Sequence, residues 1–222
     1  MATKTIRLAV VEDESLFRDL LCRSLDQTDG LEVKGDYADP DSAMAAIPTL
    51  GVDVVVLDID LASPITGVEL GIRLRRQMPD LGIMILSNHV DPQLLSSLPR
   101  DVMGGWSYLL KRSVTNVNTL SRAIEGAAMG LLVFDPELTR RTRPKPSGPL
   151  TRLSPRQIEV LALIAEGHSN GAIAEKLGLS ERSVENHVSR VYTQIDIDAT
   201  DRSAHARVMA VLLYLEGSIT VD

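Results

Sequence analysis

Apolar residues are arranged differently in the two halves of the chain. The first 135 residues contain short, continuous aliphatic runs bounded by glycine, proline or polar residues, whereas apolar residues after position 150 recur at helical spacing. Short β-branched and aliphatic runs are typical of buried parallel strands. We predict five strands, at Arg7–Val11, Leu31–Tyr37, Val52–Leu57, Gly82–Ser87 and Tyr108–Leu110.

The segments between these runs have apolar residues every three to four positions, which predicts amphipathic helices. They lie at Leu16–Leu25, Asp41–Thr49, Gly67–Met78, Gln93–Leu98 and Val117–Met129. Five strands that alternate with five helices indicate an α/β domain with a doubly wound, five-stranded parallel sheet of flavodoxin-like type. We assign this domain to residues 1–135.

Residues 136–150 are rich in proline, glycine and arginine and show no periodicity, which predicts a linker. Residues 151–217 read as a small all-α domain of four helices. The first helix has a capping box at Ser154–Gln157 and ends at Gly167, and the others are expected at Asn170–Leu177, Glu181–Ile195 and Arg202–Glu216. The Gly178-Leu179-Ser180 turn between the second and third helices is typical of a helix-turn-helix.

Charge and composition narrow the class of protein. The net charge of −7 belongs entirely to residues 1–135, while residues 136–222 are neutral. The acidic net charge argues against nonspecific binding to nucleic acid, but the neutral second part of the chain can still form a small DNA-binding domain. The single cysteine, Cys22, excludes an internal disulfide, and no apolar run approaches the roughly 20 residues that span a bilayer. Met1–Arg7 lacks the apolar region of a signal peptide, so we expect a cytoplasmic protein without membrane contact.

Chemically useful side chains follow the predicted strands. Glu12 and Asp13 follow the first strand, Asp58 the third, Ser87 ends the fourth and Lys111 follows the fifth. Ligands bind beyond the carboxyl ends of strands in an open α/β sheet, and neighbouring strands are about 5 Å apart. We therefore expect these five side chains to converge. Clustered carboxylates are hard oxygen ligands that suit Mg²⁺.

A carboxylate that faces a metal ion, with an ammonium and a hydroxyl group nearby, can attack phosphorus. Asp58 is the best candidate nucleophile. On these residues, the first 129 positions resemble the receiver domain of two-component response regulators. The resemblance implies that Asp58 accepts phosphate from a sensor histidine kinase. It also implies that Glu12, Asp13, Asp58 and the backbone carbonyl of Asp60 surround Mg²⁺.

The same resemblance implies further roles near the acceptor. Lys111 would bind the phosphoryl group, Ser87 would hydrogen-bond it, and Tyr108 would swing inward after Ser87. Two features depart from the usual pattern: the Asp58–Gly67 loop is long, and Ser107 stands where glycine is usual.

The third helix of the second domain has a polar face that suits the major groove. Asparagine can read adenine, glutamate can accept a hydrogen bond from cytosine, and arginine can bind guanine or phosphate. The candidate DNA-binding residues are Ser169, Asn170, Arg182, Ser183, Glu185, Asn186, Ser189 and Arg190.

The segments Leu153–Leu161, Gly167–Leu177 and Ser180–Val188 resemble the LuxR-type DNA-binding domain. Together with the receiver, they place the chain with the NarL/FixJ-type response regulators. The resemblance implies a transcription regulator, not an enzyme, that binds double-stranded DNA as a homodimer when it is phosphorylated.

Two alternatives stay open at this stage. In the first, the receiver serves only as an interaction module in a phosphorylation-independent transcription factor. The Asp58-Ile59-Asp60 sequence also resembles the nucleophile motif of haloacid-dehalogenase-type phosphohydrolases. That family usually carries its motif on the first strand, and Glu12 and Asp13 would then have no clear role.

Overall fold

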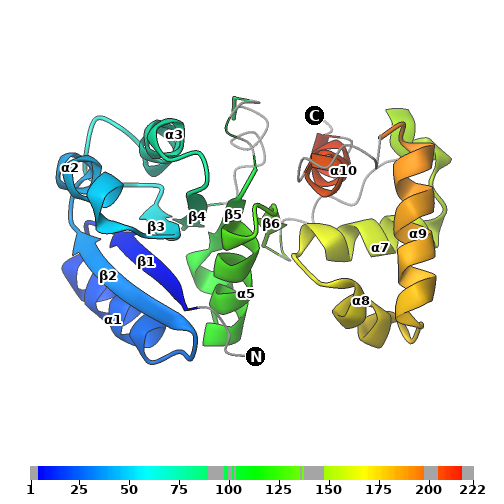
Figure 1. The fold of residues 1–222 in the computed structure, drawn as a ribbon, viewed down its shortest axis with the longest axis horizontal. Helices are drawn as coiled ribbons and strands as arrows, with labels where there is room; N and C mark the ends of the chain where they lie inside the picture. The colour runs from blue at the N-terminus through cyan, green and yellow to red at the C-terminus, as the bar shows by residue number, and fades with distance from the viewer. Residues whose placement is uncertain are drawn as a thin grey trace. The chain divides into compact units, whose positions relative to one another are not determined.

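The computed structural model describes residues 5–89, 98–99, 102, 104–135, 137, 148–197 and 205–216 (Figure 1). The chain divides into two compact units. The first comprises Met1–Val90 and Leu98–Gly130, and the second comprises Asp91–Ser97 and Leu131–Asp222. Among the helices that the structure describes, none is both long and apolar enough to cross a bilayer.

The first unit alternates strands and helices along the chain. Its elements are β1 (Ile6–Val11), α1 (Ser15–Asp26), β2 (Leu31–Tyr37), α2 (Pro40–Leu50), β3 (Val54–Asp58), α3 (Gly67–Gln77), β4 (Gly82–Ser87), β5 (Trp106–Leu110), the 3₁₀ turn η2 (Lys111–Ser113) and α5 (Val117–Ala128). The strands lie in the order β2-β1-β3-β4-β5, and every neighbouring pair is parallel. The predicted doubly wound parallel sheet is confirmed.

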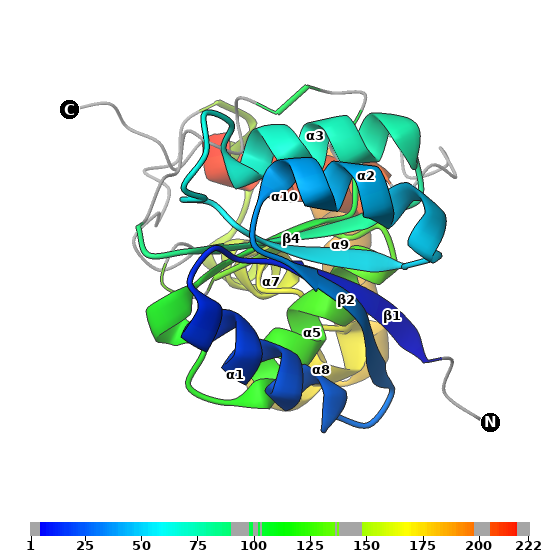
Figure 2. The ribbon, with the colours of Figure 1, turned by 90° about the vertical axis from the view of Figure 1, so that its left-hand side faces the viewer.

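Helices cover both faces of this sheet. In Figure 2, α1 and α5 lie against one face, whereas α2 and α3 lie against the other. Every residue of β3, β4 and β5 is buried in consequence. This two-sided burial explains why the central strands are continuous apolar runs instead of alternating ones.

Two glycines allow α3 to approach the sheet closely. A Cβ atom at Gly71 would lie 2.8 Å from the Trp106 ring, and one at Gly67 would lie 1.9 Å from the backbone carbonyl oxygen of Asp58. The first turn of α3 is held by a capping box in which Thr66 and Glu69 each bond the other's backbone N–H. The start of α3 is therefore packed directly against the end of β3.

Two strand boundaries differ from the prediction. β3 begins at Val54 instead of Val52. The Asp53 carboxylate accepts hydrogen bonds from the backbone and the guanidinium of Arg7, at 2.9–3.1 Å. β5 begins at Trp106, two residues before the predicted start. The polar Ser107 interrupts the apolar run, but its buried hydroxyl donates to the Ala123 carbonyl oxygen in α5 at 2.7 Å, so it fits within the strand.

The helix predicted at Gln93–Leu98 falls almost entirely outside the described residues, of which only the buried Leu98 belongs to it. The predicted linker also lies largely outside them. Residues 136 and 138–147 are not described, and its last three residues open the 3₁₀ helix η3 (Gly148–Arg152).

The described part of the second unit contains the four predicted helices. Its elements are the short strand β6 (Val133–Phe134), η3, α7 (Pro155–Ala165), α8 (Asn170–Leu177), α9 (Glu181–Gln194) and α10 (His205–Glu216). The sequence analysis did not predict β6, because two residues are too few to carry a periodic signal. The region in which α10 was expected to begin, residues 202–204, lies outside the described residues.

Local capping groups define the helices of this unit. The predicted capping box of α7 is confirmed, since Ser154 Oγ accepts from the Gln157 N–H at 3.3 Å and Gln157 Oε1 accepts from the Ser154 N–H at 2.7 Å. α8 ends at Gly178, whose φ of 63° is left-handed, and Ser180 then caps α9. The turn between α8 and α9 is therefore encoded locally.

Candidate functional site: an acidic pocket at the strand ends and a polar helix face

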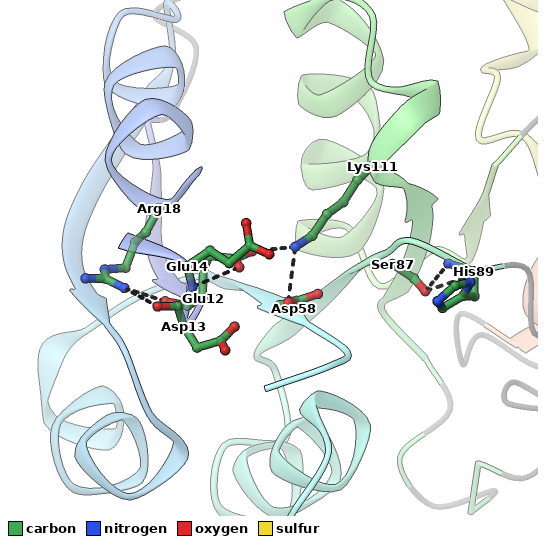
Figure 3. Close-up of polar contacts among 8 residues, drawn as sticks. All are labelled: Glu12, Asp13, Glu14, Arg18, Asp58, Ser87, His89 and Lys111. Carbon is green, nitrogen blue, oxygen red and sulfur yellow. Dashed lines mark hydrogen bonds and ion pairs between the residues drawn. The ribbon is translucent and has the colours of Figure 1, made fainter. Parts of the chain in front are cut away.

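Three carboxylates meet where β1 and β3 end. Glu12, Asp13 and Asp58 each offer an oxygen, and these oxygens lie within 4.8 Å of one another (Figure 3). β1 and β3 are adjacent and parallel, and Val11 pairs with Leu57, so the residues that follow both strands are neighbours. Glu12 and Asp58 are only 1% and 4% exposed, so the cluster is largely shielded from water.

Lys111 extends from the end of β5 into this cluster. Its ammonium lies 2.9 Å from Glu12 Oε2 and 3.1 Å from Asp58 Oδ2, and 4.5 Å from the centre of the Phe17 ring. Burial opposes the charged form of Lys111, but the hydrogen bonds and charges of Glu12 and Asp58 outweigh it and raise the Lys111 pKa. The ammonium is therefore charged at neutral pH.

Burial raises the pKa of Glu12, and the charge of Asp58 raises it further, although the hydrogen bond from Lys111 partly opposes both. Two of the three carboxylates, Glu12 and Asp58, share the Lys111 ammonium. Asp58 Oδ1 is buried and accepts no hydrogen bond from any described residue. A buried oxygen without a partner costs about 1–3 kcal/mol. The donor set and this unpartnered oxygen fit a hard divalent cation.

Ser87 and Tyr108 meet at the backbone of His89. Ser87 Oγ donates to the His89 carbonyl oxygen and accepts from its N–H, both at 3.0 Å. The buried Tyr108 hydroxyl donates to the same carbonyl oxygen. The two predicted switch residues are therefore coupled through one loop residue, while Glu12, Asp13, Asp58 and Lys111 form the acidic pocket itself.

The Asp60 side chain is exposed and does not belong to the three-carboxylate cluster that the described residues form. The Asp-x-Asp motif lies at the end of β3, an interior strand of the first unit, and not on the first strand of the chain. Glu12 also has a clear partner in Lys111. These observations remove the basis for the phosphohydrolase alternative.

The second candidate surface is one face of α9. Val184, Val188 and Val191 are buried on the opposite face and anchor the helix. The face turned away from these valines carries exposed polar side chains, namely Arg182, Glu185, Asn186, Ser189 and Arg190. This arrangement leaves groups that can donate and accept hydrogen bonds open to a partner.

The other three predicted DNA contacts lie at helix starts. Ser169 caps α8, where its hydroxyl accepts from the Ala172 N–H at 3.2 Å. The Ser183 hydroxyl is 2.8 Å from that of Ser180, the cap of α9. Asn170 is half-buried, with an Oδ1 that accepts no hydrogen bond from a described residue. Ser169 and Ser183 therefore also have structural roles.

His89, Phe17 and Arg18 also lie next to the site and were not predicted from the sequence. His89 acts through its backbone, so its side chain gives no signal. Phe17 and Arg18 follow the acidic pair within the first turns of α1, a position that could have drawn attention.

Comparison with known proteins identifies the family of each domain. The family model of the response regulator receiver domain matches residues 8–131, and that of bacterial regulatory proteins of the luxR family matches residues 151–209. The chain is 27% identical over 214 residues to the transcriptional regulatory protein DegU of Brevibacillus brevis, which covers 87% of this chain and 89% of that protein. It is 28% identical over 197 residues to the response regulator VraR of Staphylococcus aureus (strain Mu50), with 87% and 91% covered.

Solved structures show the same fold. A structure of two RcsB dimers bound to two parallel DNAs has a TM-score of 0.53 at 22% identity, with 98% of this chain and 100% of that one covered. Another RcsB structure, from Salmonella typhimurium, has a TM-score of 0.53 at 22% identity, with 96% and 99% covered. The receiver match alone spans more than half of the chain. The protein therefore belongs to the NarL/FixJ-type response regulators, phosphorylation-controlled transcription regulators that join a receiver to a LuxR-type DNA-binding domain.

Proposed function

We propose that Asp58 is the phosphoacceptor of this regulator. The observation that carries the proposal is its buried, unpartnered Oδ1 beside the Lys111 ammonium. In the reaction, an Asp58 carboxylate oxygen forms a bond to phosphorus while the bond between phosphorus and the donor breaks. The phosphoryl group remains on the protein as an acyl phosphate, and water later releases it. The protein thus accepts one phosphoryl group per cycle and is not a metabolic enzyme.

Groups around Asp58 would neutralise the negative charge of the phosphoryl group during its transfer. Glu12, Asp13, Asp58 and the backbone carbonyl of Asp60 would hold Mg²⁺, which neutralises negative charge on the transferring phosphoryl oxygens. Lys111 already lies 3.1 Å from Asp58 Oδ2, where its ammonium binds the phosphoryl group.

Ser87 and Tyr108 carry the signal away from Asp58. A hydrogen bond from Ser87 to the phosphoryl group takes the place of its bond to the His89 carbonyl oxygen, which Tyr108 also contacts. The backbone of His89 therefore changes its bonding when Asp58 is phosphorylated. Phosphorylation of Asp58 would in this way shift the equilibrium between the inactive and the active conformation of the receiver.

The partners follow from the two domains, which we place at residues 1–135 and 151–217 with a linker at 136–150. A sensor histidine kinase would donate the phosphoryl group, and α9 would read double-stranded DNA in the major groove. Ser169 and Asn170, at the start of α8, would contact the DNA beside it. The RcsB neighbour contains dimers on DNA, which supports a homodimer as the active form here. A protein with these partners acts in the cytoplasm.

Intact-mass spectrometry after incubation with acetyl phosphate and Mg²⁺ tests the acceptor. The wild-type protein should gain one phosphate and Asp58→Asn none. Asp80→Asn is the matched control, because Asp80 is exposed and precedes β4, at the edge of the sheet opposite Asp58, and it should be phosphorylated like the wild type. Phosphate on Asp58→Asn, or none on the wild type, would refute the assignment.

DNA binding tests the regulation. Sites selected by the wild-type protein from fragmented genomic DNA should bind the phosphorylated form at least tenfold more tightly than Asp58→Asn. Equal affinity of the two proteins for these sites would instead favour a phosphorylation-independent transcription factor whose receiver is an interaction module.

A further inference from the structure

Arg18 contacts the backbone of the acidic loop instead of its carboxylates. Its Nη1 lies 2.6 Å from the Glu12 carbonyl oxygen and 3.5 Å from that of Asp13 (Figure 3). Its Nε donates to Asp36 Oδ1 at 3.1 Å, and its side chain is 15% exposed. One guanidinium therefore joins the loop after β1 to the end of β2.

The loop is held from its other side by a second contact with β2. The Glu12 N–H donates to the Tyr37 carbonyl oxygen at 3.0 Å. With Arg18 on the carbonyl side, both the N–H and the C=O of Glu12 are bonded. The peptide planes that carry Glu12 and Asp13 are thereby fixed, and the two carboxylates are left to face Asp58.

The exposed ion pair is too weak to explain this placement alone. Asp36 is 52% exposed on its side chain, and such surface pairs contribute about 0–1 kcal/mol. The charge-assisted bond from Arg18 Nη1 to the Glu12 carbonyl oxygen, at 2.6 Å, is stronger, whereas the 3.5 Å contact with the Asp13 carbonyl oxygen is weak. The planar guanidinium makes these contacts and the bond to Asp36 in fixed directions at once. The Glu14 side chain does not cap α1, and at the helix start the Glu14 N–H donates to Glu12 Oε1 at 3.3 Å. That bond acts on the Glu12 carboxylate, whereas Arg18 holds the Glu12 backbone.

We propose that Arg18 is a positioning residue for the divalent-cation site, acting through the backbone of Glu12 and Asp13. The proposal rests on the function proposed for the Asp58 pocket and adds a residue to it. Groups that orient metal ligands typically change metal affinity 10- to 100-fold when they are removed. Arg18→Met should therefore weaken cation binding about tenfold.

Cation binding can be measured without phosphorylation. Mn²⁺ is titrated into the full-length protein, free Mn²⁺ is followed by electron paramagnetic resonance, and Mg²⁺ is added as competitor. Arg18→Met should show about tenfold weaker affinity and Arg18→Lys at least threefold weaker affinity, because an ammonium lacks the fork. Asp36→Asn should change the affinity less than threefold. Arg23→Met, an exposed arginine in the last turn of α1, is the matched control and should match the wild type.

A purely structural role would give a different result. Thermal unfolding without metal identifies the variants that remain folded, and wild-type affinity in a folded Arg18→Met or Arg18→Lys protein would overturn the proposal. At saturating Mg²⁺, Arg18→Met should also accept phosphate from acetyl phosphate within about twofold of the wild-type rate. A rate that stays low at saturating Mg²⁺ would contradict positioning of the cation site.

The outcomes separate this proposal from the one on which it rests. If the wild type binds Mn²⁺ but Asp58 takes no phosphate, the phosphoacceptor assignment fails while the role of Arg18 in cation binding is still measured. If Asp58 is phosphorylated and Arg18→Met binds Mn²⁺ normally, only the role of Arg18 fails.

Discussion

The acidic pocket and the α9 face are both polar, but they are built in opposite ways. The pocket joins Glu12 to Lys111, 99 positions later in the chain, and both side chains are shielded from water. The α9 face takes its polar groups from a single helix, and most of them are exposed. The pocket depends on the register of several strands, whereas the helix face depends only on local spacing.

This contrast has energetic consequences. Buried polar groups interact in a medium of low dielectric constant, so each depends strongly on the exact position of its partners. Exposed polar groups are hydrogen-bonded to water whatever their exact position, so they tolerate small shifts. A substitution near the pocket should therefore impair function by moving the buried side chains, even where the substituted residue contacts no ligand. A substitution on α9 should instead impair function by removing a contact with DNA.

The largest effect is expected for Gly67→Ala. The new Cβ would lie 1.9 Å from the Asp58 carbonyl oxygen, so α3 or the end of β3 must move. We expect a loss of about 3 kcal/mol in the free energy of unfolding, measured by urea denaturation, together with slower phosphorylation of Asp58. Wild-type values for both quantities would show that the pocket is less sensitive to geometry than its contacts indicate.

On α9, Asn186→Ala should weaken binding to selected DNA sites by about 2 kcal/mol, roughly 30-fold, and relax the base preference at one position. The thermal stability of the protein should not change, because Asn186 is exposed. Electrophoretic mobility shifts on the selected site and its single-base variants measure this. Arg190→Ala is the comparison, since an arginine on this face can bind phosphate instead of a base, and we expect the loss of a phosphate contact to weaken binding to all sequences about equally. A marked loss of stability in Asn186→Ala would contradict the expectation that substitutions on the exposed α9 face leave the fold intact.

Gly171→Ala is the counterpart of Gly67→Ala in the second unit. Gly171 lies in α8, and a Cβ there would have only ordinary contacts, the nearest being Glu181 Oε1 at 3.7 Å. Alanine favours a helix over glycine, so the free energy of unfolding should rise by about 0.5 kcal/mol. The same urea experiment tests this opposite sign, and a destabilised variant would contradict the open packing of α8.

The smallest effect concerns Cys22, on α1. Burial, followed by the negative charge of Asp36, raises the pKa of its thiol to about 11. Because the thiolate is the reactive form, alkylation by iodoacetamide should be slow at pH 7.5 and should still accelerate up to pH 9.5. A free thiol has a pKa of about 8.5, so urea-unfolded protein should level off near pH 9.5. A plateau at that pH in the folded protein would contradict the shielding of this side of α1.

Local patterns in the sequence were sufficient for several features. Two-sided burial makes the central strands continuous apolar runs, and the ends of those strands correctly located Glu12, Asp13 and Asp58 together. The capping box at Ser154 and the left-handed Gly178 involve residues close in sequence, so the ends of α7 and α8 could be predicted. β6 and the start of β5 could not, because β6 is too short to carry a periodic signal and the polar Ser107 interrupts the apolar run of β5.

What the sequence determined by itself is the alternation of strands and helices, the helix-turn-helix spacing and the chemical types of residue at the strand ends. These depend on interactions over a few positions, which periodicity and capping residues record. Only the tertiary structure decided that Lys111 bonds both Glu12 and Asp58, that Arg18 holds the acidic loop, and that Gly67 must lack a side chain. Such contacts depend on strand register and on how closely helices approach the sheet, and no local pattern records those distances.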